Sequence, residues 1–352
     1  MAQPGAGDRV RMYEAEALEL MAGVAASLGM NAEDGEIVAR HLVDDELRGA
    51  VGMSRIFIFG DEVARHGPQR TEPITVARES DITAVVDGGG HHGLVVAESA
   101  TRLAIAKAQK SGIAIVCARN HRYSGTLGYY TELIARNEMI GISVASGSFG
   151  SVAPYGAREG RLDTNPIAVG FPTTAEPIVW DIATSAISGS DVYRRLVTGE
   201  ELPPGVALDN RGEPTREPAE ALAGAILSWG GYRGSGLAMV IRLLALLSGV
   251  APFPAENGEF AFLVIVIDPS LFLPRGEFER RAAEFAAGIR AAQPAPGFSS
   301  VRMPFDRSIQ VRAQRRRDGI EIARAVYERL DSIRRSGVIP VQTVHSPREK
   351  PR

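Results

Sequence analysis

Apolar residues recur along the chain with two different periods, and the period changes near residue 80. Before this point, residues 13–28 carry apolar side chains at helical spacing and end at Gly29. Asn31 is then placed to cap a second helix that runs to about Arg48. Beyond residue 80, short apolar runs of strand length alternate with longer segments of helical period. The pattern therefore predicts a helical start followed by α/β layering.

The later segments divide into short strands and longer helices. The predicted strands are 82–86, 113–117, 140–144, 167–171 and 178–180. The predicted helices are 94–110, 126–136, 276–291 and 308–333, the last with a possible break at Gly319. Residues 260–267 form a continuous apolar run, which predicts a central strand buried on both faces.

Two further segments have a distinctive composition. Residues 236–249 are strongly apolar, but they are too few to span a membrane and include Arg242, so a buried helix is expected. Residues 199–218 are polar and rich in proline, which predicts a long ordered loop or a lid. No membrane association is expected from either segment.

Composition narrows the class of protein. The chain has 352 residues, enough for two or three lobes, with 45% hydrophobic and 23% charged residues. The formal net charge is −3, so binding to nucleic acid has no electrostatic support. Cys117 is the single cysteine, which excludes an intramolecular disulfide and fits a reducing cytoplasm. The six histidines show no metal-ligand spacing, so no metal site is expected.

The segment Gly88–Gly93 reads Gly-Gly-Gly-His-His-Gly and lies between a predicted strand and a predicted helix. Such a segment could hold a phosphate on backbone N–H groups, as in a Rossmann dinucleotide site. However, the next strand ends in Arg119-Asn120, where that fold uses an acidic residue to bind ribose. A glycine turn that only connects strand and helix is therefore the favoured interpretation.

Four longer polar segments lie between the predicted elements. Each joins glycines or small hydroxyl residues to a charge, which suits an anionic ligand. They are 163–168 (DTNPIA), 181–185 (DIATS), 207–218 (ALDNRGEPTREP) and 230–238 (GGYRGSGLA).

Taken together and in this order, these segments resemble the malate/L-lactate dehydrogenase family, which is unrelated to the Rossmann-type lactate dehydrogenases. The resemblance covers nearly the whole chain, from about Tyr13 to Ile333. It implies an α/β fold, with a non-Rossmann NAD(P)-binding sheet domain and a helical domain formed by both chain termini. The expected helical domain is 10–75 with 305–340, the sheet domain is 76–304, and 1–9 and 345–352 are flexible tails. The resemblance also implies NADH or NADPH as cofactor, a small-molecule substrate and a homodimer.

Both histidines of the family are missing from their expected places. Near the N-terminus the family has R-G-x-x-S-H-G-x-x-R, whereas this chain reads RGAVGMSR over 48–55, so two residues are missing or Met53 replaces the histidine. The second histidine belongs to N-S-x-H-F-G. Here the chain reads NHRYSG over 120–125, which places Tyr123 at that position and His121 two residues earlier.

Further charged positions also differ. The lysine of the family's G-G-x-K-G is Arg233, and its C-terminal P-G-E is Pro304-Phe305-Asp306. Carried over position by position, the resemblance implies these site residues: Tyr123 and His121 for catalysis; Arg48, Arg55, Thr164 and Asn165 for the substrate; and Asp181, Ala183, Thr184, Ser185, Tyr232, Arg233, Phe305, Asp306 and Arg307 for the cofactor.

The altered residues bear on the expected chemistry. Reduction of a ketone leaves an alkoxide that needs a proton donor, whereas a protonated cyclic imine mainly needs hydride alignment and a carboxylate clamp. The sequence therefore favours a reductase acting on a cyclic imine acid, with a 2-keto or 2-hydroxy acid as the other candidate. A family member with non-redox chemistry and a catalytically inactive scaffold protein stay open as alternatives.

Overall fold

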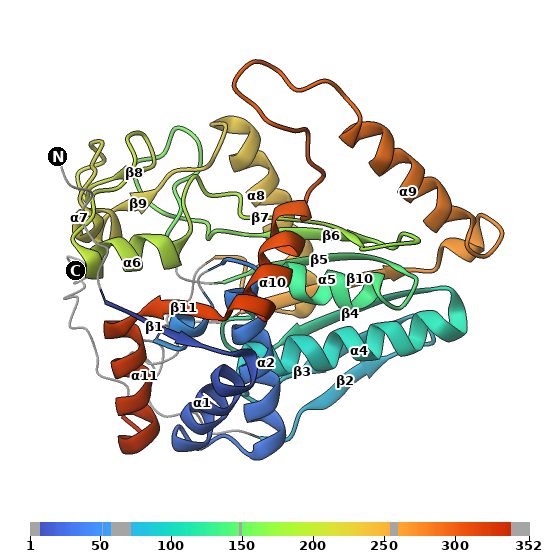
Figure 1. Cartoon of the computed structure of the whole chain (residues 1–352), viewed down its shortest axis with the longest axis horizontal. Helices are drawn as coiled ribbons and strands as arrows, with labels where there is room; N and C mark the ends of the chain where they lie inside the picture. Colours follow the sequence, from blue (N-terminus) through green and yellow to red (C-terminus); the bar gives the residue numbers. More distant parts are fainter. Residues whose placement is uncertain (1–7, 51, 58–71, 148–149, 254–259, 339–352) are drawn as a thin grey trace. The chain divides into compact units, whose positions relative to one another are not determined.

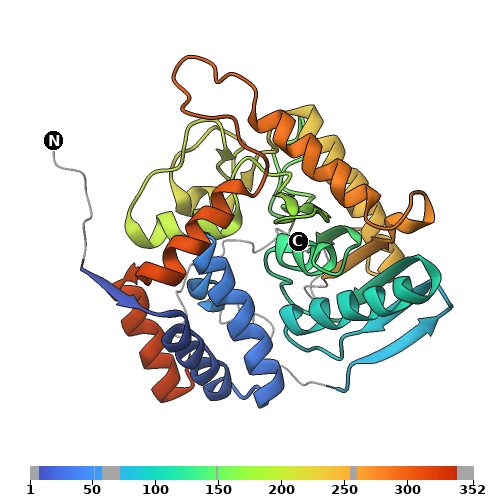
Figure 2. The ribbon, with the colours of Figure 1, turned by 45° about the vertical axis from the view of Figure 1, so that its right-hand side comes forward.

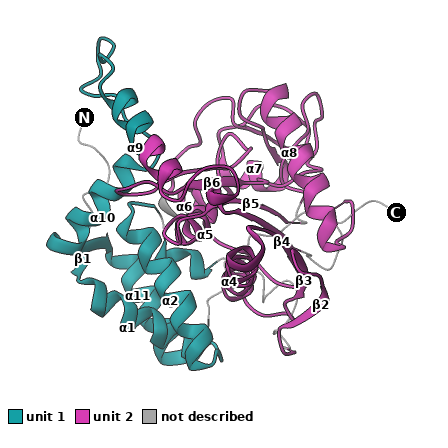
Figure 3. Ribbon diagram, turned by 90° about the vertical axis from the view of Figure 1, so that its right-hand side faces the viewer, with its two compact units in different colours: residues 1–65, 283–341 teal, residues 66–282, 342–352 magenta. Residues whose placement is uncertain are grey.

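The computed structural model describes residues 8–50, 52–57, 72–147, 150–253 and 260–338 (Figure 1). The chain folds as two compact units (Figure 3). Unit 1 consists of residues 1–65 and 283–341, and unit 2 of residues 66–282 and 342–352. Both division points differ from the positions 75/76 and 304/305 expected from the sequence.

Unit 1 is built from both ends of the chain. Its elements are β1 (Arg9–Met12), α1 (Glu14–Ser27), α2 (Ala32–Leu47), the short 3-10 helix η1 (Met53–Arg55), α10 (Asp306–Asp318), β11 (Ile320–Ala323) and α11 (Arg324–Ser336). Helix α9 (Glu277–Arg290) begins in unit 2 and ends in unit 1. Helix α1 packs between α2 and α11. The family's helical domain made from both termini is therefore present.

Local chemistry explains where these helices begin and end. The Asn31 side chain accepts a hydrogen bond from the backbone N–H of Asp34 at 2.9 Å, so the predicted cap of α2 is confirmed. Gly319 has φ +92°, a conformation that favours glycine, and it separates α10 from β11. Strand β11 pairs antiparallel with β1, from Arg9 opposite Ala323 to Met12 opposite Ile320. Arg9 therefore belongs to a strand rather than to the expected tail.

Unit 2 contains a seven-stranded sheet in the order β2-β3-β4-β10-β5-β6-β7. The strands are β2 (Thr75–Glu79), β3 (Thr83–Asp87), β4 (Ile113–Arg119), β5 (Ile140–Ser146), β6 (Ile167–Phe171), β7 (Ile178–Ile182) and β10 (Ala261–Ile267). The β3–β4 pair is parallel and the other neighbours are antiparallel. The sheet is thus not a doubly wound Rossmann sheet. The predicted central strand is confirmed as β10, although it runs antiparallel to both neighbours.

Helices cover both faces of this sheet. Helices α4 (Gly93–Ser111) and α5 (Leu127–Ala135) lie on one face (Figure 2). Helix α8 (Tyr232–Ala245) packs on the other face, where Ile241 meets Cys117, Val144 and Leu263. Successive strand residues point to opposite faces, so Phe262 and Val264 join the α4–α5 core while Leu263 joins the α8 core.

A smaller cluster completes unit 2. It contains α6 (Gly189–Thr198), β8 (Ala207–Leu208), α7 (Pro218–Ala223) and β9 (Ala225–Ile226), while η2 (Leu246–Ser248) follows α8 and η3 (Pro269–Leu271) follows β10. The predicted loop 199–218 is ordered, because β8 pairs with β9 and Leu202 and Ala207 are buried in a shared core.

The buried helix expected over 236–249 is buried on one side only. Ile241 and Ala245 are buried, but Val240 is 52% exposed, Leu243 65% and Leu247 61%. The run is apolar on two sides, and only one side packs on the sheet of its own chain. A hydrophobic pattern shows which residues avoid water but not which surface covers them.

Candidate functional site

Most of the predicted site segments of unit 2 meet at one end of the sheet. Strands β4, β5 and β7 end there, and β6 and β10 begin there. The pairs that establish this are Phe262 with Ala118, Ala261 with Ser146, Ile167 with Val144 and Ile167 with Ile182. The segments 120–123, 163–165 and 183–185 therefore follow or precede strands at this common end.

The Gly88–Gly93 segment is a structural turn. The backbone N–H groups of Gly88 and Gly90 donate to the carbonyl oxygens of Arg119 and Asn120, at 2.9 and 2.8 Å, and the N–H of Gly89 donates to the Asp87 carboxylate at 3.1 Å. These donors are therefore occupied within the protein and do not form a phosphate cradle. The glycine-turn interpretation is confirmed.

His121 is buried behind the end of β4, with 3% of its surface exposed. Its Nδ1 lies 2.7 Å from the carbonyl oxygen of Arg122, and because a carbonyl only accepts, Nδ1 carries the proton. Nε2 has no hydrogen-bond partner among the described residues. Burial lowers the pKa of His121 to about 4, so the ring is neutral near pH 7. A neutral imidazole with this tautomer can accept a hydrogen bond at Nε2 but has no proton there to donate.

Tyr123 lies in the same loop and is half-buried. The loop is fixed from two sides. The hydroxyl of the fully buried Tyr130 donates to the carbonyl oxygen of Ser124 at 2.7 Å. Gly93 packs directly against the backbone of Arg122 and Tyr123. The phenol is thus carried by a loop whose backbone has little freedom.

Asn165, which follows Thr164 in the chain, forms hydrogen bonds that hold the fold together. Its amide nitrogen donates to the carbonyl oxygen of Ala238 and its amide oxygen accepts from the Ser146 hydroxyl, both at 2.9 Å. Arg242 reaches the same place and donates to the Ser146 hydroxyl at 3.0 Å and to the Gly147 carbonyl at 2.9 Å. Asn165 and Arg242 therefore join α8 to the end of β5, a role that the sequence did not indicate.

The segment after β7 is also held by internal hydrogen bonds. The Asp181 carboxylate accepts from the backbone N–H of Gly128 at 2.7 Å, in the first turn of α5. The Thr184 hydroxyl donates to the Thr164 carbonyl at 2.8 Å, and the Ser185 hydroxyl donates to the Ile187 carbonyl at 2.7 Å. These two hydroxyl protons are therefore directed at backbone carbonyls. Ala183 precedes Thr184 and contributes no polar side chain.

An exposed aromatic and cationic cluster lies at the start of α8. Tyr155 and Tyr232 are 69% and 63% exposed, and their rings meet edge to face at 6.2 Å. The Arg233 guanidinium lies 5.6 Å from the centre of the Tyr232 ring. A helix N-terminus favours negative charge, and aromatic rings can stack on a base. This cluster suits the phosphate and base of a nucleotide.

In unit 1, Arg48 and Arg55 follow α2 and lie beside acidic residues of that helix. Arg48 forms an ion pair with Asp44. Arg55 Nη1 lies 3.6 Å from Oδ2 of Asp45, a carboxylate with no exposed surface. His41 Nε2 lies 3.7 Å from the same oxygen. Asp45 was not among the site residues expected from the sequence, although its spacing of four residues from His41 on a predicted helix places both on one face.

Phe305, Asp306 and Arg307 begin α10. Phe305 has φ +77°, which is rare for a bulky residue, and its ring lies 5.1 Å from the Arg48 guanidinium carbon. The Asp306 carboxylate binds Arg290 through two hydrogen bonds of 2.9 and 2.6 Å, which lowers its pKa. Arg307 is exposed. These residues belong to unit 1 and Asp181–Ser185 to unit 2, so their meeting in one cleft stays a prediction.

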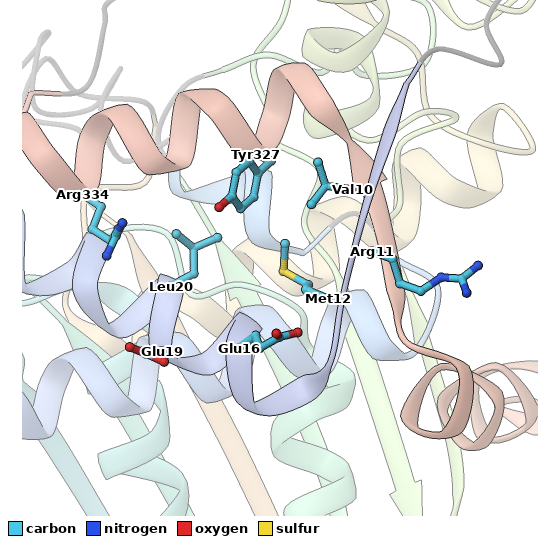
Figure 4. Close-up of a pocket in the computed structure, with 8 residues that line it drawn as sticks. All are labelled: Val10, Arg11, Met12, Glu16, Glu19, Leu20, Tyr327 and Arg334. Carbon is cyan, nitrogen blue, oxygen red and sulfur yellow. The ribbon is translucent and has the colours of Figure 1, made fainter.

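A separate pocket of about 230 Å³ lies in unit 1 between β1, α1 and α11 (Figure 4). It is lined by Val10, Arg11, Met12, Glu16, Glu19, Leu20, Tyr327 and Arg334. None of the predicted site residues lines it. Arg11 and Arg334 are paired with Glu321 and Asp331.

No helix in the described part of the chain combines the length and apolar character that a membrane crossing requires. No group of three or more His, Cys, Asp or Glu side chains in the described ranges could hold a metal ion.

Comparison with known proteins identifies the family. Residues 13–331 match the family model described as malate/L-lactate dehydrogenase. The L-sulfolactate dehydrogenase of Methanocaldococcus jannaschii is 34% identical over 328 residues, covering 90% of this chain and 94% of the relative. The Δ1-pyrroline-2-carboxylate/Δ1-piperideine-2-carboxylate reductase of Pseudomonas syringae pv. tomato is 36% identical over 247 residues, covering 67% and 70%.

Solved structures agree with this result. The malate dehydrogenase of Pyrococcus horikoshii superposes with a TM-score of 0.82 at 31% identity, covering 96% of this chain and 99% of the other. The expected non-Rossmann fold and oxidoreductase class are thereby confirmed. This chain therefore belongs to the malate/L-lactate dehydrogenase family.

Proposed function

We propose that this protein is an NAD(P)H-dependent reductase of a small cyclic imine acid, whose carboxylate is bound by Arg55. The observation that supports this most directly is the state of His121, which burial keeps neutral and which therefore does not supply a proton near pH 7. The relatives' names include malate, sulfolactate and pyrroline-2-carboxylate, all of which carry a carboxylate next to the reacting carbon. A 2-keto or 2-hydroxy acid is the alternative substrate class.

The residues would act as follows. The nicotinamide, when bound, supplies the hydride. Arg55 would grip the substrate carboxylate through parallel N–H donors and so fix the reacting carbon. Thr164 is another side chain that the resemblance implies for the substrate. An iminium nitrogen becomes a neutral amine on accepting the electron pair, so no proton delivery is needed. A ketone would become an alkoxide, and then Tyr123 would have to donate its phenolic proton.

The cofactor would lie along the sheet end and the cluster at the start of α8. Arg233 would bind a phosphate, and Tyr155 and Tyr232 would offer aromatic surface to a base. Arg233 would also bear on the choice between NADH and NADPH, because a guanidinium favours partners that it can bind through two hydrogen bonds. Arg233→Ala should therefore weaken binding of the preferred nucleotide.

We also propose that the protein is a cytoplasmic homodimer. The apolar side of α8 and η2, formed by Val240, Leu243 and Leu247, is exposed in the single chain. A continuous apolar stripe on a helix of a water-soluble protein favours association. A second copy of this chain is the partner that the family resemblance implies.

The decisive experiment measures turnover of two substrates with each nucleotide. Δ1-pyrroline-2-carboxylate is tested with NADH and NADPH, and malate with NAD⁺ and NADP⁺. Faster turnover of the imine acid supports the proposal, whereas faster turnover of malate would show that the substrate is a 2-hydroxy acid. Failure of all four nucleotides to bind in calorimetry would contradict a redox function and favour non-redox chemistry or an inactive scaffold.

A further inference from the structure

Two neighbouring carboxylates of α2 are divided between different arginines. Asp44 pairs with Arg48 and lies 3.5 Å from Arg312, while Asp45 lies 3.6 Å from Arg55. Consecutive helix residues point about 100° apart, since a turn takes about 3.6 residues. The two side chains therefore leave the helix in different directions, and each contacts its own set of cations.

The Asp45 carboxylate is enclosed by the protein. It has no exposed surface, and burying a carboxylate is costly unless a positive charge lies close to it. His41 is also fully buried, and its pKa is well below the usual value because of burial and the nearby charges of Arg48 and Arg55. His41 is thus neutral near pH 7, and the Arg55 guanidinium, with Nη1 3.6 Å from the carboxylate, supplies a positive charge beside Asp45.

Arg55 differs from Asp45 in its access to solvent. Its side chain is 16% exposed, whereas that of Asp45 is fully buried. A guanidinium has five N–H donors in one plane, and a carboxylate engages at most two of them in a parallel pair. The ion pair between Arg55 Nη1 and the enclosed Asp45 carboxylate, 3.6 Å apart, therefore restrains the direction in which the guanidinium plane points.

We propose that Asp45 is a positioning residue that aims the Arg55 guanidinium at the substrate carboxylate, with His41 Nε2 lying 3.7 Å from the same Asp45 oxygen. This inference rests on the proposed function, in which Arg55 binds that carboxylate. Arg48, which the resemblance also implied for substrate binding, has neighbours different from those of Arg55. It pairs with Asp44, and the Phe305 ring lies 5.1 Å from its guanidinium. Asp44 therefore stabilises the packing of α10 on α2, whereas Asp45 orients the arginine that binds the substrate.

The test is a double-mutant cycle on the full-length protein with Δ1-pyrroline-2-carboxylate or malate, whichever the enzyme turns over. Asp45→Asn keeps the shape of the side chain but removes its charge. We expect KM to rise about 10- to 100-fold while kcat changes by less than about 3-fold, because a uniform binding interaction is lost. Arg55→Ala should raise KM at least as much. The double variant should resemble Arg55→Ala alone, because Asp45 acts only through Arg55.

Asp44→Asn is the matched control on the adjacent residue. It should lower Tm, because Arg48 and Arg312 lose their carboxylate, but it should change KM by less than about 3-fold. Arg55→Lys provides a second route if Asp45→Asn folds poorly. It keeps the charge near Asp45 but loses the planar fork, so KM should rise while Tm is retained.

The outcomes separate the two proposals. An unchanged KM in both Arg55→Ala and Arg55→Lys would overturn the proposed role of Arg55 and this inference with it. A raised KM in Arg55→Ala, combined with an unchanged KM in Asp45→Asn, would overturn the inference alone. The same conclusion would follow if the two substitutions multiplied fully in the double variant, because Asp45 would then act independently of Arg55.

Discussion

Gly93 lies so close to the loop after β4 that a Cβ atom at this position would stand 2.0 Å from the carbonyl oxygen of Arg122. This contact fixes the backbone that carries His121 and Tyr123. Gly93→Ala should therefore force the loop or α4 to move, at a cost on the order of 3 kcal/mol in the free energy of unfolding. Urea denaturation would measure the loss, and activity should fall with it.

Gly236→Ala is the matched control for this prediction. Gly236 lies inside α8, and a Cβ there would have no atom within 4 Å. Alanine is the better helix former by about 1 kcal/mol, so this variant should be slightly more stable than the natural chain. Equal stability of the two alanine variants would show that the Gly93 contact is not a constraint.

Buried histidine should make the protein less stable in mild acid. The pKa of His121 is about 4 in the folded chain, whereas the unfolded value is about 6.5. As pH falls below 6.5 the unfolded chain takes up this proton first, so stability falls until pH approaches 4. Between pH 7 and pH 5 the loss from His121 should be about 2 kcal/mol.

A substitution of His121 would measure its contribution to the pH dependence of stability. The free energy of unfolding of His121→Gln should fall less between pH 7 and pH 5 than that of the natural chain. His41 also has a lowered pKa and acts in the same direction, so some acid sensitivity should persist in the variant. An identical pH dependence in the two proteins would mean that His121 is not buried in its neutral form.

Asn165 offers a test between a structural and a substrate-binding role. It is fully buried, and its amide joins the Ser146 hydroxyl to the Ala238 carbonyl. Asn165→Ala should cost about 2–3 kcal/mol in unfolding free energy, because the buried partner groups lose their bonds. The control is Asn137→Ala, whose exposed amide donates to the Leu133 carbonyl and should contribute less than about 0.5 kcal/mol. A stable Asn165→Ala with a raised KM would instead place this amide on the substrate.

The sequence predicted the elements of this fold well because hydrophobic period and caps are local properties. Residues 167–171 were expected as a strand and form β6, and Asn31 caps α2 as expected. The resemblance to the family supplied the non-Rossmann class, and the local pattern at Arg119-Asn120 already favoured a glycine turn over a nucleotide site at Gly88–Gly93. The sequence did not show which carbonyl oxygens accept from this turn, because they follow the next strand.

Properties that depend on tertiary contact could not be predicted in this way. A motif places Thr184 and Ser185 near a site, but it does not show that both hydroxyls donate to backbone carbonyls. The pairing of Asp45 with Arg55 joins residues ten positions apart through a turn that no periodicity describes. Arg242 likewise stands out in the sequence only as a charge within an apolar run, yet its guanidinium meets carbonyl and hydroxyl oxygens at the end of β5.

The exposed side of α8 leads to a prediction about assembly. Leu243→Glu places a charge on the apolar stripe where the single chain leaves it 65% exposed, so the fold of one chain should be unaffected. If a second copy covers this stripe, burying the charge would cost several kcal/mol and the dimer should dissociate. Analytical ultracentrifugation at micromolar concentration would show this. Val338→Glu, at a residue 61% exposed in unit 1, is the control and should leave assembly unchanged.

The Tyr123 phenol distinguishes the two substrate classes. If the substrate is a ketone, Tyr123→Phe removes the proton donor for the alkoxide, and kcat should fall about 10²- to 10⁴-fold. If the substrate is an already protonated imine, the same change should lower kcat by less than about 3-fold, because nitrogen needs no further proton. Tyr13→Phe, which removes an exposed hydroxyl in unit 1, should leave kcat unchanged. A large loss in Tyr123→Phe with the imine acid as substrate would contradict the proposed chemistry and give the phenol a direct role in that reduction.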